Sequence, residues 1–300
     1  MTNSVRLATA PINWGVESPD FPGNPDPDEL LAAVAASGYQ GCELGPFAYF
    51  GRSLEQVKER FASHSLAVVA IWLDIPLAAE LDEQYRAVID TAAKRLRDLG
   101  AEVLIISDLL TEARMAIVSR VEQFPDLRWA DNQWLQVRAT LLEIERISAD
   151  HGLRLAVHPH VGGHIESGEE IERLLGEIEG TGIRLCLDTG HIRLGGSDPM
   201  AIFEIAADHV VHLHAKDIDE AIFAQLRSGA LHYGEAVGKG LYCNLGSGIV
   251  DWQRYANIVL ATGYSGWVVA EQDRLLVPGL MAPFDSNERN FTFLRDLLLT

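Results

Sequence analysis

The sequence predicts an α/β protein in which eight strands and eight helices alternate and close into one (β/α)8 barrel. The first observation behind this prediction is a weak internal repeat of an amphipathic helix, a glycine and a short apolar strand, at residues 36–43, 98–106, 150–157, 180–187 and 261–269. A glycine just past a helix end adopts the left-handed conformation that stops the helix and turns the chain into the next strand. Helices and strands that alternate in this way indicate βα units around a parallel sheet.

The number of strand candidates is the second observation, because eight is the number that closes a barrel of this kind. The candidates lie near residues 6–11, 40–44, 66–73, 103–107, 154–158, 184–188, 210–215 and 267–271. Helices are expected at residues 27–37, 54–64, 83–99, 131–150, 167–179, 199–208, 252–262 and 287–299. An open, doubly wound sheet is the alternative, but no glycine-rich phosphate-binding loop follows the first strand. The barrel is therefore favoured.

The chain has no linker rich in proline, glycine or serine, so residues 1–300 are expected to form a single domain. Two connections are longer than the others, at residues 109–129 and 217–251. Both leave the carboxyl ends of predicted strands, where barrel enzymes form their substrate loops and lids.

Composition limits the class of partner. The net charge is −19, which makes nucleic acid and anionic membrane surfaces poor partners. No apolar run is long enough for a membrane span, and the N-terminus lacks a signal pattern. The three cysteines have no paired spacing, so we expect no disulfide framework and a reducing, cytoplasmic setting. The sequence leaves open whether the chain forms a homo-oligomer.

Three apolar runs in the second half of the chain each end in a side chain that binds metals. Asp188, His214 and Glu271 end the sixth, seventh and eighth predicted strands, whose carboxyl ends share one rim of the barrel. Packing or helix capping explains any one of them alone, but the three together favour one shared divalent ion. A shell of oxygen and nitrogen without thiolate suits Mn²⁺, Co²⁺, Mg²⁺ or Zn²⁺ in a catalytic site. His158 ends the fifth strand and is the candidate for a fourth ligand, because alternation points it into the barrel.

Four further residues are candidates for acid–base chemistry at this rim: Lys216, His191, His160 and Glu166. Lys216 follows the seventh-strand histidine by two residues and so faces the same way. Next to a divalent cation its pKa would be depressed, which suits a general base, or it would hold an oxyanion as an ammonium; an ion pair with a neighbouring carboxylate is the alternative. His191 suits an acid–base or supporting role three residues after the sixth-strand aspartate. His160 and Glu166 lie just beyond the fifth strand, within reach of a substrate, although at least one of the nearby histidines is expected only to hydrogen-bond a loop.

Four other residues are candidates for binding the substrate. Glu43 ends the second strand across the barrel mouth, where it would bind a hydroxyl group. Trp14 and Trp72 end the first and third strands and would form an apolar wall for a sugar ring, although tryptophans at such positions more often pack the rim. Asp217 lies two residues after the end of the seventh strand and completes this set.

Six stretches of the chain match motifs of a known superfamily. They are residues 10–14, 38–45, 158–162, 187–199, 210–217 and 263–273, and the strongest is the run Leu-Asp-Thr-Gly-His at 187–191. By these motifs the sequence resembles the superfamily of xylose-isomerase-like TIM barrels, which includes sugar isomerases, epimerases and dehydratases. Within this superfamily it is most similar to the inosose (2-keto-myo-inositol) dehydratases. The stretches cover both ends and nearly all of the second half of the chain.

The resemblance implies that Asp188, His214 and Glu271 bind a divalent metal, commonly manganese or cobalt. Many relatives place a glutamate on the fifth strand as the fourth ligand, and here Ala156 or His158 falls at that position. Two loops depart from the dehydratase pattern. Residues 15–20 read Gly-Val-Glu-Ser-Pro-Asp instead of an Asn-Asp-Asp-like run, and residues 245–248 read Leu-Gly-Ser-Gly instead of Pro-Gly-Asp-Gly. Both loops are expected to shape substrate specificity.

Three functional hypotheses follow from these residues. The first is a metal-dependent dehydratase, a lyase that removes water from a keto-sugar or cyclitol such as an inosose through an enediolate. The second is a sugar isomerase or epimerase that uses the same metal and enediolate but returns the proton to another position, which requires acid–base groups on both faces of the substrate. The third is a sugar-binding barrel without turnover, against which the intact ligand set argues.

Overall fold

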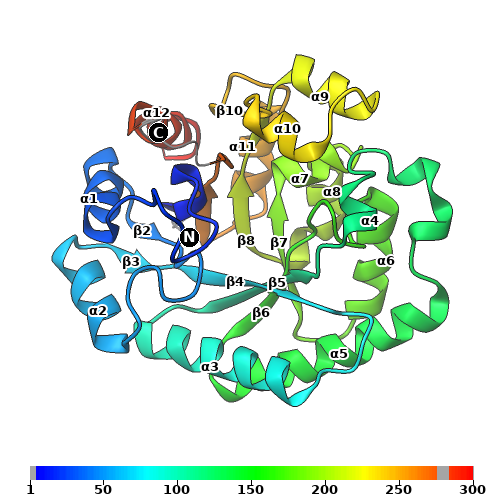
Figure 1. Cartoon of the computed structure of the whole chain (residues 1–300), viewed down its shortest axis with the longest axis horizontal. Helices are drawn as coiled ribbons and strands as arrows, with labels where there is room; N and C mark the ends of the chain where they lie inside the picture. Colours follow the sequence, from blue (N-terminus) through cyan, green and yellow to red (C-terminus); the bar gives the residue numbers. More distant parts are fainter. Residues whose placement is uncertain (1–4, 276–283, 300) are drawn as a thin grey trace.

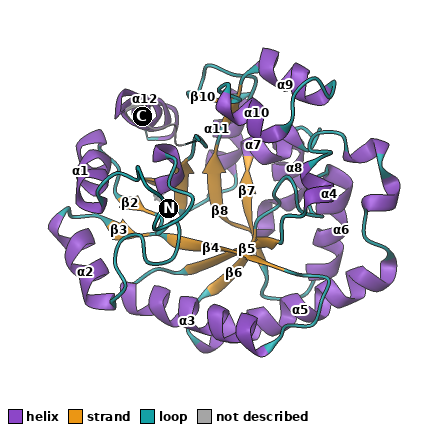
Figure 2. Cartoon of the chain, viewed as in Figure 1, coloured by secondary structure: helices purple, strands orange, loops and turns teal. Residues whose placement is uncertain are grey.

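Nine parallel strands form the centre of the computed structural model, which describes residues 5–275 and 284–299. Helices surround these strands (Figure 1 and Figure 2). Neighbouring strands are hydrogen-bonded in the order β3-β2-β1-β11-β8-β7-β6-β5-β4. The strands are β1 Arg6–Thr9, β2 Gly41–Cys42, β3 Ala67–Val68, β4 Ala70–Ile75, β5 Val103–Asp108, β6 Arg154–Val157, β7 Arg184–Asp188, β8 Val210–Ala215 and β11 Trp267–Ala270.

The two ends of this order, β3 and β4, belong to one stretch of chain and are separated only by Val69. The N–H of Val69 donates to Cys42 O at 3.1 Å, and the N–H of Leu44 donates to Ala70 O at 2.9 Å. The sheet therefore curls into a nearly closed barrel, and the predicted (β/α)8 TIM barrel is confirmed. The single strand expected at residues 66–73 is wrong in detail, because β3 pairs with β2 and β4 pairs with β5.

Eight helices cover the outside of the barrel near the predicted positions. They are α1 Pro27–Ser37, α2 Leu54–Ser63, α3 Glu83–Leu99, α5 Asp131–Asp150, α6 Gly168–Ile178, α8 Pro199–Ala206, α11 Trp252–Ala261 and α12 Phe284–Leu298. Capping boxes join Ser53 to Gln56 and Ser167 to Glu170, and they satisfy N–H groups that a helix start leaves unpaired. None of the helices in the described residues is both long enough and apolar enough to cross a membrane.

The two long connections fold into short elements that the sequence analysis did not predict. The first contains α4 Glu112–Met115 and the 3-10 turns Val121–Gln123 and Pro125–Leu127. The second contains an antiparallel hairpin of β9 Asp217–Ile218 and β10 Tyr242–Cys243, with helices α9 Glu220–Arg227 and α10 Tyr233–Gly238. Figure 1 shows α9 and α10 together on the side towards which β7 and β8 point. Three further short elements are the 3-10 turns Pro11–Trp14 and Ala207–His209 and the helix α7 Thr189–Leu194.

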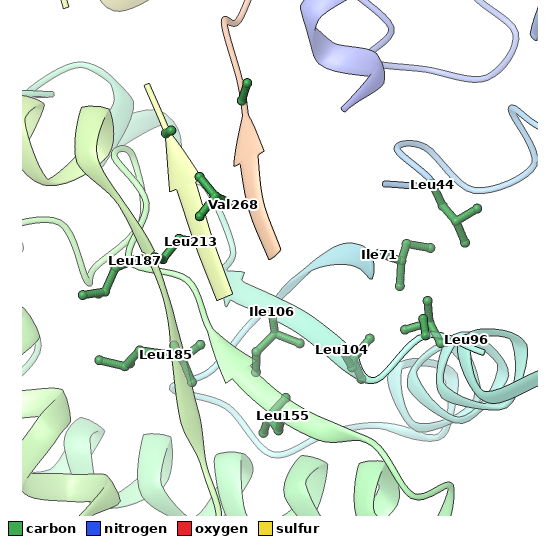
Figure 3. Packing of buried hydrophobic residues seen from close by; sticks show 14 of the residues in the cluster. Leu44, Ile71, Leu96, Leu104, Ile106, Leu155, Leu185, Leu187, Leu213 and Val268 are labelled. Atoms are coloured by element: carbon green, nitrogen blue, oxygen red, sulfur yellow. The ribbon is translucent and has the colours of Figure 1, made fainter. Parts of the chain in front are cut away.

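Apolar side chains form one cluster inside the barrel and a larger one between the strands and the helices. On β7, Cys186 belongs to the inner cluster, whereas Leu185 and Leu187 belong to the outer one (Figure 3). Because side chains alternate along a strand, Asp188 faces the inside of the barrel. On β8, Leu213 packs in the outer cluster, so the histidines on either side of it also face inward.

Candidate metal centre

The carboxyl ends of β7, β8 and β11 bring the three expected ligands together. His214 Nδ1 lies 3.1 Å from Glu271 Oε2 and 3.7 Å from Asp188 Oδ2. One potential ligand atom of each residue lies within 4.8 Å of those of the other two, and all three side chains are buried. Strand register explains this convergence, because Asp188 and Val269 both pair with His214 and Glu271 follows two residues after Val269.

Asp188 is fixed by its place at the junction of a strand and a helix. It is the last residue of β7 and the N-cap of α7. Its Oδ1 accepts hydrogen bonds from the N–H groups of Gly190 at 2.7 Å and His191 at 2.9 Å. These two bonds orient the carboxylate and leave Oδ2 facing the other two candidate ligands.

Glu43 orients the histidine of the site. Its Oε1 lies 3.0 Å from His214 Nε2 and 2.8 Å from His212 Nε2. An ionised carboxylate only accepts, so both Nε2 atoms carry hydrogen and Nδ1 is the atom of His214 that faces the candidate ligand carboxylates. Burial raises the pKa of Glu43, but His214 and the two hydrogen bonds lower it further than burial raises it, so Glu43 stays ionised. The sequence analysis placed Glu43 against a substrate hydroxyl, whereas the structure places it beneath the histidines.

The donor atoms at this point fit a divalent cation. Among the described residues, Asp188 Oδ2 and His214 Nδ1 have no geometric hydrogen bond, and ion-pair contacts with Lys216, with Glu271 and with each other hold them at this point. Burial raises the pKa of Asp188, but Lys216 and neighbouring histidines lower it well below its ordinary value, so the carboxylate is ionised. Burial lowers the pKa of His214, but the Glu271 and Glu43 carboxylates and the contact with Asp188 raise it overall, and a metal would replace the proton on Nδ1.

Lys216 reaches the same point from the end of β8. Its Nζ lies 2.8 Å from Glu271 Oε2, 3.2 Å from Asp188 Oδ2 and 3.1 Å from His191 Nε2. Burial lowers the pKa of Lys216, but Asp188, Asp273 and Glu271 raise it well above its ordinary value. The side chain is therefore an ammonium in this structure, and its ion pair with Glu271 is the alternative that the sequence analysis kept beside the two chemical roles.

Three of the predicted histidines lie next to one another beside these carboxylates. The ring centroids of His160 and His191 are 3.8 Å apart, and those of His158 and His214 are 4.9 Å apart. Burial lowers the pKa of His160 to about 4, and it lowers the pKa values of His158 and His191 well below the ordinary value. A ring nitrogen of His158 lies within 4.8 Å of possible ligand atoms of His160 and His191, and of those of Cys186 and His214. His158 forms no such group with Asp188 and Glu271, the residues beside which it was expected as a fourth ligand.

Two predicted site residues hold loops instead of facing the barrel mouth. Glu166 is buried, and its oxygens accept hydrogen bonds from the N–H groups of Ser119 at 2.9 Å and Gly162 at 3.0 Å. Asp217 is also buried. Its two oxygens accept five hydrogen bonds of 2.8–3.1 Å, from the N–H groups of Ile218, Gly246, Gly248 and Val250 and from the indole of Trp252. Both carboxylates thus serve as internal acceptors, in contrast to the catalytic and substrate-binding roles expected for them.

The two predicted tryptophans differ in position. The Trp72 ring stacks on the His160 ring with 5.7 Å between centroids, and its Nε1 donates to Ser107 Oγ at 3.0 Å. The sequence analysis expected Trp72 at the end of its strand, whereas it lies within β4, half-buried next to a histidine of the site. Trp14 is buried in the outer apolar cluster, and its Nε1 has no hydrogen-bond partner among the described residues.

Three residues that the sequence analysis did not assign also belong to this site. His212 binds Glu43, and Asp273 Oδ1 lies 3.1 Å from Lys216 Nζ. Burial raises the pKa of Asp273 to about 6, against the lowering effect of Lys216. His212 and Asp273 lie two residues from predicted ligands, so strand alternation would have indicated them. The third, Tyr242, comes from β10 and lies with its ring 5.5 Å from Lys216 Nζ, a contact with no signal in the sequence.

Known sequences that are similar to this chain match it over most of its length. A family model described as xylose isomerase-like TIM barrel matches residues 31–296. The rhizopine catabolism protein MocC of Rhizobium meliloti is 29% identical over 90% of this chain and 82% of that protein. The inosose dehydratase of Geobacillus thermodenitrificans is 25% identical over 94% of each chain. That of Lactiplantibacillus plantarum is 25% identical over 90% of this chain and 89% of its own length.

Comparison with solved structures shows the fold. A 3-keto-D-glucoside 4-epimerase from E. coli superposes with a TM-score of 0.69 at 16% identity, covering 98% of this chain and 100% of the other. A structure of the IolI protein with a bound zinc atom superposes with a TM-score of 0.69 at 17% identity and covers 98% of each chain. At these identities the likeness concerns the barrel alone.

Proposed function

The chain belongs to the xylose isomerase-like TIM barrel family, and from this premise we propose that it is a metal-dependent dehydratase. Its substrate would be a keto-polyol such as an inosose, from which it removes water. Several relatives that match over most of the chain are named inosose dehydratase, at about 25% identity, which supports this choice of reaction.

The observation that carries the proposal is the meeting of Asp188, His214 and Glu271 at one buried point. Two carboxylates and one imidazole nitrogen converge there, and this set of oxygen and nitrogen donors without thiolate is one that a divalent catalytic ion prefers. These three residues would hold the cation, and Mn²⁺ or Co²⁺ would suit the mixed carboxylate and imidazole set. A cation bound there would act as a Lewis acid on the ketone oxygen and make the neighbouring C–H group more acidic.

The remaining residues of the site would bind the substrate and move its protons. The Lys216 ammonium would hold the oxygen on which negative charge develops. The neutral imidazoles of His160 and His191, whose rings lie 3.8 Å apart, would accept the proton from the carbon next to the ketone. The same pair would return it to the hydroxyl group on the next carbon, so that this group leaves as water. Trp72, stacked on His160, would cover one face of the substrate.

Incubation of the protein with an inosose tests the proposal. The protein is first stripped with a chelator and then loaded with Mn²⁺ or Co²⁺. Metal-dependent ultraviolet absorbance of a dehydrated dione supports the dehydratase. Interconversion of keto-sugar isomers without loss of water would instead support an isomerase or epimerase. Neither reaction, with sugar binding retained, would support a binding barrel without turnover.

Substitution of the candidate ligand Glu271 gives a sharper prediction. We expect Glu271→Gln to weaken metal binding and to lower turnover by more than the ~10²–10⁴-fold typical of losing one acid–base group. Calorimetric metal titration and the dione assay measure the two effects. Glu288→Gln, at an exposed glutamate of α12, is the matched control. Normal activity and metal affinity in Glu271→Gln would refute the site.

A further inference from the structure

Lys216 places its positive charge at the centre of a buried group of carboxylates. Its Nζ lies 2.8 Å from Glu271 Oε2, 3.2 Å from Asp188 Oδ2 and 3.1 Å from Asp273 Oδ1. The lysine is 3% exposed, so its charge is matched by these neighbours and not by water. Removing one partner of such a buried ionic group leaves the others uncompensated.

Two of the three oxygens that bind the ammonium are the same atoms that would bind a metal. His214 Nδ1 faces Glu271 Oε2 at 3.1 Å and Asp188 Oδ2 at 3.7 Å. Lys216 Nζ uses these same two oxygens. An ammonium and a divalent cation therefore compete for one pair of carboxylate oxygens.

The backbone and the Cβ of Lys216 are held in place, so any movement of its charge takes place along the side chain beyond Cβ. Its N–H donates to Thr189 Oγ1 at 2.9 Å, and that hydroxyl donates to Lys216 O at 2.7 Å. A Cβ placed on Gly190 would lie only 2.6 Å from Lys216 Cβ, so α7 packs directly against the stem. The Tyr242 ring lies 5.5 Å from Nζ.

We propose that Lys216 is an exchangeable counter-cation of the metal centre. In the metal-free protein its ammonium holds the Asp188 and Glu271 carboxylates together at the positions required of ligands. A divalent cation displaces the ammonium from these two residues, and the ammonium keeps the partners that are not candidate ligands, Asp273 Oδ1 and His191 Nε2, both at 3.1 Å. This inference rests on the metal centre of the proposed function.

The test compares wild type with Lys216→Met, both stripped of metal with a chelator, by thermal melting and by calorimetric titration with MnCl₂. We expect the metal-free variant to melt at a lower temperature, because three neighbouring carboxylates lose the ammonium that lies within 3.2 Å of each of them. We also expect it to bind Mn²⁺ at least about 10-fold more tightly, because a resident positive charge within a few ångströms opposes a divalent ion. Its melting temperature should therefore rise more than that of wild type when Mn²⁺ is added.

Two matched variants separate charge from shape. Lys216→Arg keeps the positive charge and should keep the weaker Mn²⁺ affinity of wild type. Lys239→Met, at an exposed lysine just after α10, should change neither melting nor Mn²⁺ affinity. If Lys216→Met does not fold, Lys216→Met with Asp273→Asn removes one charge of each sign, and it should bind Mn²⁺ more tightly than Asp273→Asn alone.

The outcomes distinguish this inference from the proposed function. If wild type binds Mn²⁺ and Lys216→Met binds it equally well or more weakly, the counter-cation role is overturned and the metal centre stands. If wild type binds neither Mn²⁺ nor Co²⁺, both the metal centre and the role of Lys216 are overturned. Tighter binding by Lys216→Met together with a less stable metal-free state supports the inference.

Discussion

At the scale of the residue, the histidine of the candidate site depends on Glu43. The Glu43 carboxylate fixes which nitrogen of His214 faces the candidate metal position, and such supporting carboxylates typically affect metal affinity 10–100-fold. We therefore expect Glu43→Gln to weaken Mn²⁺ binding by about 10–100-fold in a calorimetric titration. Glu59→Gln, at an exposed glutamate of α2, is the control and should bind as wild type does. Unchanged affinity in Glu43→Gln would show that His214 is oriented without this carboxylate.

The raised pKa of the buried Glu166 carboxyl predicts that the stability of the protein depends on pH. Burial raises its pKa from 4.5 to about 7, against the lowering effect of the Gly162 and Ser119 N–H groups and of Arg114. The folded protein thus keeps this proton at pH values where the unfolded chain releases it. The stabilisation that comes from the proton on Glu166 is therefore fully present below pH 4.5, and it is lost as the pH rises towards 7.

Glu166→Gln tests this prediction, because an amide does not ionise. Melting temperatures are measured from pH 4.5 to pH 7 for wild type and variant. The melting temperature of wild type should fall relative to that of Glu166→Gln across this range. Glu172→Gln, at an exposed position of α6, should follow wild type at every pH. Parallel curves for wild type and Glu166→Gln would contradict the raised pKa.

At the scale of the element, strand alternation is what made the candidate ligands predictable. Each of the runs that end in Asp188, His214 and Glu271 has an apolar pattern that identifies a strand, and the side chain at its end follows from period two. Loops have no such period. The hydrogen bonds of Glu166 and Asp217 join segments that are distant in sequence, so their internal roles could be seen only in the structure. The same reason explains why Tyr242 was missed.

The hydrogen bonds of the Asp217 side chain indicate that this residue stabilises the second long connection, residues 217–251. The five N–H groups that it binds extend from Ile218 to Trp252 and fasten the loop that precedes α11. In Asp217→Asn one oxygen becomes a donor, so at least two buried N–H groups lose their acceptor. We expect the free energy of unfolding to fall by at least about 2 kcal/mol, and limited proteolysis to cut residues 244–250 faster. Asp208→Asn, at an exposed aspartate, is the control, and wild-type stability and protection in Asp217→Asn would contradict the role.

At the scale of the whole molecule, the sequence predicted the barrel because the helix–glycine–strand repeat, although weak, recurs along the chain and the strand candidates number eight. It did not predict α4, α7, α9 and α10, which have four to eight residues and are too short to show a helical period. It also did not predict the break at Val69, because the change of partner from β2 to β5 depends on how the barrel closes and not on a local pattern. Closure is thus a property of the assembled sheet.

Gly41 lies on β2, next to β3, where the barrel closes. A substitution at this position measures how closely the residues at the closure are packed. A Cβ at Gly41 would lie 2.6 Å from Val69 Cγ2, 2.9 Å from Trp267 Cη2 and 3.0 Å from Ala67 O, so the side chains of Val69 and Trp267 and the backbone of β3 would have to move. We expect Gly41→Ala to lower the free energy of unfolding in urea by about 1–3 kcal/mol, as overpacking of a dense core does.

Gly176 provides the opposite case with the same substitution. It lies within α6, and a Cβ there would meet no atom within 4 Å, so Gly176→Ala should raise the free energy of unfolding by up to about 1 kcal/mol through helix propensity. The two variants differ from wild type by the same methyl group, so opposite signs would separate steric crowding at the closure from a general effect of replacing glycine. If Gly41→Ala were as stable as Gly176→Ala, the barrel would have room at its closure, and the close packing of β2 against Val69 and Trp267 would be wrong.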